Sequence, residues 1–458
     1  MMLLSEAGKA INADLCGIDT HFSGVTTDSR KVVAGDLFVA LKGERFDGHD
    51  YVAQCLDQGA VAAMVDQQSM VCGQQSAKPL LAVKDTRLGL GELAAYWRSK
   101  FSMPLAAITG SNGKTTVKEM LASILRAASS QEGVLATEGN LNNDIGLPLT
   151  LLKLRASHRY TVAEMGMNHP GEIAYLTKLA QPTVALITNA GAAHLEGLGS
   201  VEAVARAKGE IFSGLAIDGI AVINADDTYA SLWRELAVPR KRLTFGLESS
   251  ADVSARYVLE DYGVELCLKT PEGDVDVRLG VPGLHNLKNA LAASAAAVAM
   301  HVPLQTIADG LQAFGGVKGR LQRKSGCCGA VLIDDTYNAN PASMRAAIGV
   351  LAAITGEKIF VMGDMGELGE NAAALHREIG AEAKAAGVDT LYGLGVMTTE
   401  AVAGFGAGAA HFETLENLVA VVREKLATGV TVLVKGSRFM RMERVVEALM
   451  EKEIASCC

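Results

Sequence analysis

One loop between a strand and a helix constrains the fold of this chain most. The apolar run Leu105–Thr109 predicts a strand, and Thr115–Ala127 carries apolar residues at helical spacing, which predicts an amphipathic helix. Between them stands the segment Gly110-Ser-Asn-Gly-Lys-Thr-Thr116. Glycines in such a turn let backbone N–H groups converge on phosphate oxygens at the helix N-terminus. We therefore expect a parallel α/β sheet with a phosphate-binding loop at its carboxyl edge.

The side chains of this loop suit a nucleoside triphosphate, and we expect ATP. Lys114 is placed to reach the β- and γ-phosphates, and Thr115 to ligate Mg²⁺. Only two residues separate Gly110 from Gly113, whereas the common pattern has about four. The alternative is an ordinary strand–helix turn, which the flanking elements and the doubled threonine disfavour. The predicted ATP-binding residues of the loop are Gly110, Ser111, Asn112, Gly113, Lys114, Thr115 and Thr116.

The chain of 458 residues is longer than one compact core needs, and it separates into three α/β segments. Residues 1–84 predict a small N-terminal domain. Residues 85–314 predict a central parallel-sheet domain that carries the loop, with a short antiparallel insertion at 252–280. Residues 315–458 predict a C-terminal Rossmann-like domain, because short apolar strands again alternate with helices.

Charge and cysteine content narrow the classes of function. The formal net charge of −9 gives no general attraction to nucleic acid or to an anionic membrane, so neither is an expected partner. The eight cysteines are scattered and none forms a C-x-x-C pair, which is typical of a cytosolic chain. Met1–Ile11 does not look like a signal peptide, and no apolar run is long enough to span a bilayer. We expect a soluble, cytoplasmic, monomeric enzyme without membrane insertion.

Two further polar segments leave the carboxyl edge of the predicted central sheet. The strand Tyr160–Glu164 ends in a carboxylate, and the strand Val184–Thr188 is followed by a loop that contains His194. Beside a phosphate-binding loop, Glu164 and His194 are candidate ligands for one or two Mg²⁺ ions. Taken alone, the first would be a capping residue and the second a loop residue. Lys208 lies in an Ala-rich helix, where composition alone favours a solvated surface residue.

Together these segments resemble the Mur ligase family, and the resemblance covers essentially the whole chain. Members of this family join an amino acid or a peptide to a UDP-linked muramoyl precursor of bacterial peptidoglycan. The matching segments are the loop, those around Glu164 and His194, the helix around Lys208, His285–Asn289, and Gly319-Arg320. The resemblance implies that Lys208 is carbamylated and helps to fix magnesium as a carboxylate. It also implies that Asn289, Arg320 and Asp335 contact the nucleotide.

Long polar segments point to the branch of the family that adds a dipeptide. Asn140–Pro148 and Glu164-Met-Gly match this branch, and Asp335–Met344 is the most specific match. The resemblance therefore implies ATP-dependent ligation of D-alanyl-D-alanine to UDP-N-acetylmuramoyl-tripeptide through an acyl phosphate. The alternatives are the sibling that adds the third peptide residue and a folylpolyglutamate synthetase, both disfavoured by these segments. A third alternative is a switch or scaffold that binds nucleotide without ligating anything. It is disfavoured because it would leave Glu164, His194 and Lys208 without a role.

The resemblance also implies contacts with the two other substrates. Thr27–Arg30 and Leu41–His49 resemble the family's UDP-binding loops, and Lys435–Arg438 is either an anion site or a helix cap. Gly363–Gly369 follows another strand and has no assigned role. The candidate substrate-binding residues are Ser29, Arg30, Lys42, Gly43, Asp47, His49, Asn140, Asn142, Asn143, Asn338, Asn340, Lys435, Ser437 and Arg438. The candidate catalytic residues are Lys114, Glu164, His194 and Lys208, and the candidate metal ligands are Thr115, Glu164, His194 and carbamylated Lys208.

Overall fold

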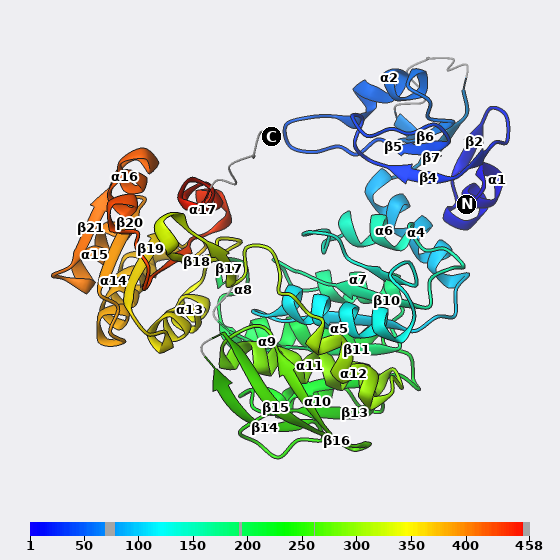
Figure 1. Cartoon of the computed structure of the whole chain (residues 1–458). Helices are drawn as coiled ribbons and strands as arrows, with labels where there is room; N and C mark the ends of the chain where they lie inside the picture. Colours follow the sequence, from blue (N-terminus) through cyan, green and yellow to red (C-terminus); the bar gives the residue numbers. More distant parts are fainter. Residues whose placement is uncertain (69–77, 192–194, 261, 452–458) are drawn as a thin grey trace, which may run out of the picture.

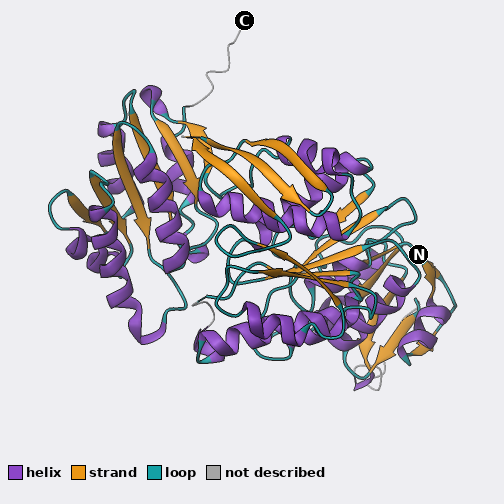
Figure 2. Ribbon diagram, turned by 90° about the horizontal axis from the view of Figure 1, so that it is seen from below, coloured by secondary structure: helices purple, strands orange, loops and turns teal. Residues whose placement is uncertain are grey.

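The chain folds into three lobes that follow one another in sequence, called here the N-terminal, central and C-terminal lobes (Figure 1). This computed structural model describes residues 1–68, 78–191, 195–260 and 262–451. Each lobe contains a largely parallel sheet, and helices lie along the faces of these sheets (Figure 2). The α/β class expected from the sequence is therefore confirmed. Within the described ranges, no helix combines the length and apolar character needed to cross a bilayer.

The N-terminal lobe, from β1 to β7, is built on a five-stranded sheet in the order β2-β7-β6-β5-β4. Only β2 runs antiparallel to its neighbour. The strands β5 and β6 are apolar and largely buried. The elements are β1 (Met2–Leu3), α1 (Leu4–Ile11), β2 (Asp14–Cys16), β3 (His21–Phe22), β4 (Gly24–Thr26), β5 (Asp36–Val39), α2 (Val52–Asp57), β6 (Ala62–Asp66) and β7 (Leu80–Val83).

The central lobe contains six parallel strands in the order β13-β12-β11-β8-β10-β9. Strand β8, which precedes the phosphate-binding loop, lies between β11 and β10. Residues that follow these three strands therefore meet at one edge of the sheet. The strands are β8 (Leu105–Thr109), β9 (Val134–Ala136), β10 (Tyr160–Glu164), β11 (Val184–Ile187), β12 (Ile220–Asn224) and β13 (Lys241–Phe245).

The two faces of the central sheet bury separate apolar clusters, because successive side chains of a strand point to opposite sides. Leu105 and Ala107 join a cluster that continues through α4 into the N-terminal lobe. Ala106 and Ile108 pack instead with residues of α5, α11 and α12. The helices are α4 (Thr86–Ser99), α5 (Lys114–Ala128), α6 (Gly146–Leu151), α7 (Glu172–Ala180), α8 (Leu195–Leu198), α9 (Val201–Gly209), α10 (Ala230–Leu236), α11 (Leu284–Ala299) and α12 (Leu304–Gln312).

The predicted insertion is an antiparallel sheet of three strands, β14 (Ser254–Glu260), β15 (Gly263–Thr270) and β16 (Gly273–Leu279). The C-terminal lobe contains a sheet in the order β17-β18-β22-β19-β20-β21, in which only β17 is antiparallel. Its elements are β17 (Gln322–Ser325), β18 (Val331–Asp335), α13 (Pro341–Ala353), β19 (Glu357–Gly363), α14 (Ala372–Ala385), β20 (Thr390–Leu394), α15 (Thr398–Phe405), β21 (Ala409–Phe412), α16 (Leu415–Lys425), β22 (Val430–Lys435) and α17 (Glu443–Leu449).

Candidate active site

The loop between β8 and α5 has the backbone shape of a phosphate cradle. Gly110 and Gly113 have φ values of 152° and 82°, a region that side chains rarely adopt. A Cβ atom at Gly110 would collide with Thr188, and one at Gly113 with the amide of Asn289. Both glycines are therefore required by close approach as well as by backbone conformation. The first helical residue is Lys114, so the free N–H groups of α5 open onto this loop.

The Lys114 ammonium folds back onto its own loop. Its Nζ donates to the carbonyl oxygen of Gly110 at 2.6 Å and lies 3.4 Å from that of Ser111. Burial lowers the pKa of Lys114, the Glu164 carboxylate opposes this shift, and the Arg320 guanidinium adds to it. A cation that donates only to neutral carbonyls and lies beside a second cation favours an anionic ligand, and the predicted phosphate contact of Lys114 stays a prediction.

Glu164 ends β10 directly beside the loop, because it pairs in register with Ile108 of β8. Its Oε2 accepts from the Thr115 hydroxyl at 2.9 Å, and its Oε1 accepts from the Asn142 amide at 2.8 Å. The carboxylate is 2% exposed and has no cationic partner at hydrogen-bond distance in the described ranges. A buried carboxylate against a threonine hydroxyl is a donor set that suits Mg²⁺, whose remaining positions are usually filled by water and phosphate oxygens.

Lys208 is buried, contrary to what the composition of its helix suggests. Its side chain is 1% exposed near the carboxyl end of α9. Burial lowers the pKa of Lys208 well below its usual value, and the neighbouring Lys114 charge lowers it further. Within the described residues its amine forms no hydrogen bond or ion pair. Both effects favour the uncharged form of this amine over the ammonium.

Arg320 reaches the loop from the first residues of the C-terminal lobe. One of its terminal nitrogens donates to the Thr115 hydroxyl at 3.3 Å, and its guanidinium carbon lies 4.4 Å from the centre of the Tyr337 ring. Its Nε is buried without a hydrogen-bond partner. Asn289 of α11 lies against Gly113, as noted above. An unsatisfied guanidinium donor and an amide that converge on the loop support the predicted nucleotide contacts of Arg320 and Asn289.

A direct hydrogen bond joins the C-terminal lobe to the phosphate-binding loop. The amide nitrogen of Asn340 donates to the Asn112 side-chain oxygen at 2.8 Å. The Asn340 oxygen simultaneously accepts from the backbone of Ser343 at 2.9 Å and caps α13. The carboxyl edges of the central and C-terminal sheets therefore face each other across this contact.

Asn340→Asp is expected to separate the two roles of Asn340. The aspartate still caps α13 but cannot donate to Asn112, so the KM for ATP should rise by about 3- to 10-fold, the equivalent of one hydrogen bond. Asn340→Ala should raise the KM similarly and also destabilise the lobe by about 1 kcal/mol through loss of the cap. Steady-state kinetics and thermal denaturation of both variants measure this. An unchanged KM in Asn340→Asp would contradict a functional contact.

Asp335 and Lys435 form a buried ion pair at the carboxyl ends of β18 and β22. Lys435 Nζ lies 2.6 Å from Asp335 Oδ2 and donates to the Asn338 carbonyl at 3.0 Å. His285 of α11 faces this pair. Burial lowers the pKa of His285 to about 4, with Asp335 opposing and Lys435 adding to the shift. Lys435 is thus already neutralised within the protein, and its predicted anion contact stays a prediction.

Ser437 ties together three loops at the same edge of the C-terminal sheet. Its hydroxyl donates to the Ala339 carbonyl at 3.2 Å and accepts from the Gly366 backbone at 2.8 Å. Gly366 belongs to the loop that the sequence left without a role. Arg438 next to it is largely exposed and pairs with Glu443 at 3.0 Å. The structure brings Asn338, Asn340, Lys435 and Ser437 to one edge, with Arg438 at its border.

The predicted UDP-binding residues gather in the N-terminal lobe. His49 is held between Asp47, which contacts its Nδ1, and the Asp66 backbone, which donates to its Nε2 at 3.1 Å. Lys42 lies 3.7 Å from Asp47 and is mostly exposed. Arg30 is also exposed and pairs with Asp28, which lowers the pKa of that carboxyl to about 2. Ser29 and Gly43 lie in these same two loops.

The asparagines of the Asn140–Asn143 loop differ in what they contact: one contacts the candidate site and another holds the local backbone. Asn142 contacts Glu164 as described, whereas the Asn143 side chain accepts from the backbone N–H of Gly146, the first residue of α6, at 2.9 Å. Asn140 is exposed. The adjacent Asp144 pairs with Arg87 of α4 at 2.7 Å, which anchors the loop on the side of the N-terminal lobe.

His194 lies outside the described residues, so its predicted role as a metal ligand stays a prediction. In the described part of the chain, no three His, Cys, Asp or Glu side chains come together as a metal centre. Three residues near the site were not singled out from the sequence: Thr137, Asn189 and Tyr337. Asn189 accepts from the Asn112 backbone at 2.9 Å, and it follows β11 at the edge where such residues are expected.

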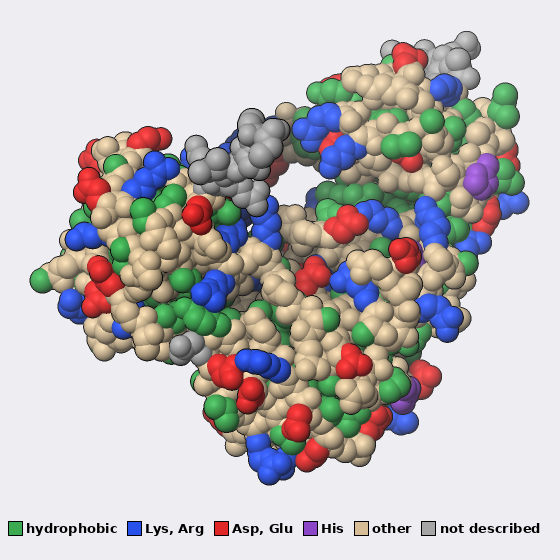
Figure 3. Space-filling view, in the orientation of Figure 1, with side chains coloured by type: hydrophobic (Ala, Val, Ile, Leu, Met, Phe, Trp, Pro, Cys, Tyr) green, Lys and Arg blue, Asp and Glu red, His purple; other side chains and the backbone are tan. Residues whose placement is uncertain are grey.

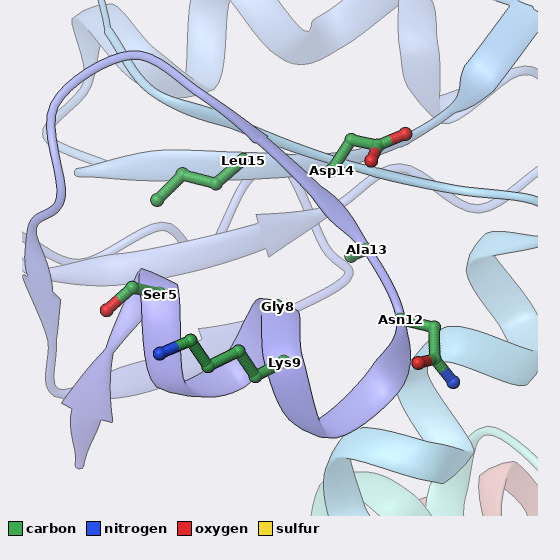
Figure 4. Close-up of a pocket in the computed structure, with 7 residues that line it drawn as sticks. All are labelled: Ser5, Gly8, Lys9, Asn12, Ala13, Asp14 and Leu15. Atoms are coloured by element: carbon green, nitrogen blue, oxygen red, sulfur yellow. The ribbon is translucent and has the colours of Figure 1, made fainter.

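A gap separates the lobes on the face seen in Figure 3. All three lobes border this gap, and both basic (Lys, Arg) and acidic (Asp, Glu) side chains lie around its rim. A separate depression of about 520 Å³ beside α1 is lined by Ser5, Gly8, Lys9, Asn12, Ala13, Asp14 and Leu15 (Figure 4). None of these residues belongs to the loop edge described above, so this depression is not the candidate active site.

Three family models match consecutive parts of this chain. The "Mur ligase family, catalytic domain" matches residues 21–98, the "Mur ligase middle domain" residues 108–297, and the "Mur ligase, glutamate ligase domain" residues 319–438. A relative from Escherichia coli (strain K12), named UDP-N-acetylmuramoyl-tripeptide–D-alanyl-D-alanine ligase, is 44% identical over 452 residues and covers 98% of each chain. A relative of the same name from Bacillus subtilis (strain 168) is 35% identical and covers 95% of each.

Solved structures agree with these relatives. The crystal structure of MurF from Acinetobacter baumannii aligns with a TM-score of 0.90 at 38% identity and covers 98% of both chains. The MurF ligase from Thermotoga maritima in complex with ADP aligns with a TM-score of 0.82 at 29% identity and covers 93% of this chain and 96% of that one. The resemblance found in the motifs thus extends over the whole fold, and the chain belongs to the Mur ligase family.

Proposed function

We infer that this protein is an ATP-dependent ligase that joins D-alanyl-D-alanine to UDP-N-acetylmuramoyl-tripeptide. The product is the UDP-muramoyl-pentapeptide precursor of bacterial peptidoglycan. Full-length relatives and MurF structures support this function. The structural observation that carries it is the convergence of Lys114, Glu164 and Arg320 on one phosphate-binding loop between two lobes.

Amide formation from a free carboxylate needs a better leaving group than oxide, and ATP provides one. The terminal carboxylate of the tripeptide attacks the γ-phosphorus, and ADP leaves. The free amine of D-alanyl-D-alanine then attacks the acyl carbon and loses a proton, and phosphate leaves. Lys114 and Arg320 would neutralise the charge that gathers on the phosphoryl group. The protein supplies positioning and exclusion of water, so no side-chain nucleophile is required.

Thr115 and Glu164 are the residues proposed to hold Mg²⁺ with the nucleotide. Their hydroxyl and carboxylate oxygens are hard donors, as this ion prefers. The ion would supply charge neutralisation at the β- and γ-phosphates. The structure of the Thermotoga maritima relative with ADP supports a nucleotide at this site. His194 is proposed as a further ligand on the basis of the motif alone.

Lys208 is proposed to carry a carbamate. Desolvation lowers the pKa of its buried amine and so favours the neutral form, which is the form that can attack CO₂. The nitrogen forms a bond to carbon and releases one proton, which leaves a carboxylate at the end of the side chain. This negative group would satisfy the nearby Lys114 ammonium and assist in fixing magnesium. Burial of an unpaired amine beside another cation has no evident structural benefit, which favours this reading.

The remaining substrate residues and the domain division are proposals of the same kind. Residues 1–84 would bind the UDP part, 85–314 the ATP, and 315–458 would close the site from the other side. The exposed side chains of Lys42 and Arg30 suit a pyrophosphate. Asn289 and Asp335 are proposed to contact the nucleotide, and the asparagines at 140–143 and 338–340 the peptide parts. We further propose a cytoplasmic monomer that binds no nucleic acid.

ADP release with defined acceptors tests the function directly. ADP should form only when ATP, a UDP-muramoyl-tripeptide and D-alanyl-D-alanine are all present. The tripeptide is supplied with meso-diaminopimelate or with lysine as its third residue. UDP-muramoyl-dipeptide with either single amino acid is the control for the sibling that adds the third residue. ADP release without any acceptor, or only with the dipeptide substrate, would refute the proposed function.

A further inference from the structure

Lys118 is a fully buried lysine that the proposed chemistry does not use. It lies in α5, and its side chain is 1% exposed. Its Nζ donates to the Thr137 carbonyl at 2.6 Å and lies 2.7 Å from the Glu119 carboxylate. Removing an ammonium group from water is costly even when it is paired. An apolar residue at this position would avoid that desolvation cost. The hydrogen bond from Lys118 to Thr137 is therefore expected to serve a purpose other than packing.

Thr137 connects the end of β9 to the end of β10. Its backbone N–H donates to the Val162 carbonyl at 3.0 Å, and its hydroxyl accepts from the Glu164 N–H at 2.9 Å. Thr137 itself is 1% exposed. The Lys118 ammonium therefore holds, through one buried residue, the backbone of the proposed magnesium-binding carboxylate.

The same stretch of chain also holds the Glu164 side chain. Five residues after Thr137, the Asn142 amide donates to Glu164 Oε1 at 2.8 Å, and the Asn142 carbonyl accepts from the Gly166 N–H at 2.8 Å. Thr115 donates to the other carboxylate oxygen at 2.9 Å. Thr115 and Lys118 are three residues apart and share one face of α5. Helix α5 thus contacts Glu164 directly through Thr115 in its first turn, and indirectly through Lys118 and Thr137 from its second turn.

We propose that Lys118 is a positioning residue for the ligation reaction. It fixes the segment 137–142 against α5 and thereby sets the place of Glu164 relative to Thr115 and the phosphate-binding loop. The proposal rests on the proposed function, in which Glu164 binds magnesium. Without the ammonium, segment 137–142 loses its anchor on α5, and the Thr137 hydroxyl and the Asn142 amide move with it.

Lys118→Met tests this role, because methionine keeps an unbranched side chain of similar length. In the enzyme without nucleotide or metal, hydrogen exchange at the Glu164 and Gly166 amides should become faster. The affinity for Mn²⁺ in the presence of ADP should fall by at least ~10-fold, the usual effect of losing a residue that orients a metal ligand. The value of kcat should fall with it, while the KM for D-alanyl-D-alanine stays unchanged.

Lys153→Met is the matched control. This lysine pairs at 2.7 Å with Glu138, next to Thr137 in the chain, but both side chains are largely exposed. An exposed ion pair contributes little, so hydrogen exchange at Glu164 and the Mn²⁺ affinity should remain those of the wild type.

Thr137→Val provides a second route to the same result if Lys118→Met folds poorly. It removes only the acceptor of the Glu164 N–H and should weaken Mn²⁺ binding similarly, whereas Thr137→Ser should restore it. In the double variant the losses should not add, because both residues act through the same connection. Additive losses would overturn the proposal. So would a lower thermal midpoint with unchanged Mn²⁺ affinity and unchanged exchange at Glu164.

These measurements also separate this proposal from the proposed function. A wild-type protein that binds Mn²⁺ with ADP but does not ligate the dipeptide would refute the function and leave the role of Lys118 testable by exchange. A ligating wild type whose Lys118→Met variant retains Mn²⁺ affinity and slow exchange would refute only the role of Lys118.

Discussion

Lys208→Ala is expected to reduce ligation by at least about 10²-fold, the scale of losing one group that organises charge in the transition state. The buried Lys208 amine has no partner within the described residues and has a pKa well below that of a free lysine. Its proposed carbamate would supply the negative charge beside Lys114 and the metal. The alanine leaves a cavity there and no charge. Steady-state ADP release with all three substrates measures the loss.

Chemical rescue identifies the group that is lost. Added acetate or formate should partly restore the activity of Lys208→Ala, since a small carboxylate fits the space and the charge of the carbamate. The wild type under the same salts is the control and should not be stimulated. After exposure to ¹³C-bicarbonate, the wild type should give a carbamate ¹³C signal that the variant lacks. Full activity of the variant, or wild-type activity without any carbamate signal, would contradict the proposal.

The fold could be predicted from the sequence where strands are apolar and buried. The predicted strands Leu105–Thr109 and Tyr160–Glu164 have the same bounds in the structure. Both faces of these parallel strands are buried, so their sequences are continuous apolar runs. The edge strands β9, β13, β17 and β21 were missed. β17 is Gln-Arg-Lys-Ser, for example, and its pairing with β18 arises from backbone hydrogen bonds that leave no apolar pattern.

The sequence predicts those residues of the candidate site that belong to a motif at the end of a strand. Glu164 was found because it ends β10 beside the loop. The contact of Asn340 with Asn112 joins residues 228 positions apart, and no local pattern encodes which loop of one lobe meets which loop of another. The burial of Lys208 likewise depends on packing against the rest of the lobe. Composition suggested a solvated lysine, and family resemblance alone suggested otherwise.

Glu164→Ala is expected to reduce Mg²⁺-dependent turnover far more than nucleotide binding. Glu164 is the one carboxylate among the described residues that contacts the Thr115 hydroxyl, at 2.9 Å. Its loss should reduce kcat by about 10²- to 10³-fold, because the charge that assists phosphoryl transfer is no longer held in place. The KM for ATP should change by less than about 10-fold, since the loop backbone and Lys114 still bind the phosphates.

Two companion variants decide whether the carboxylate binds the metal directly. Glu164→Gln keeps the shape of the side chain and an acceptor for Asn142, but it removes the negative charge. It should therefore resemble the alanine variant in turnover, and its activity should require more Mg²⁺ than the wild type. Glu138→Gln removes an exposed carboxylate of the neighbouring loop and should behave as the wild type. Equal losses of nucleotide binding and turnover in Glu164→Ala would instead assign Glu164 to the shape of the loop, because a residue that only supports the phosphate cradle affects both to the same extent.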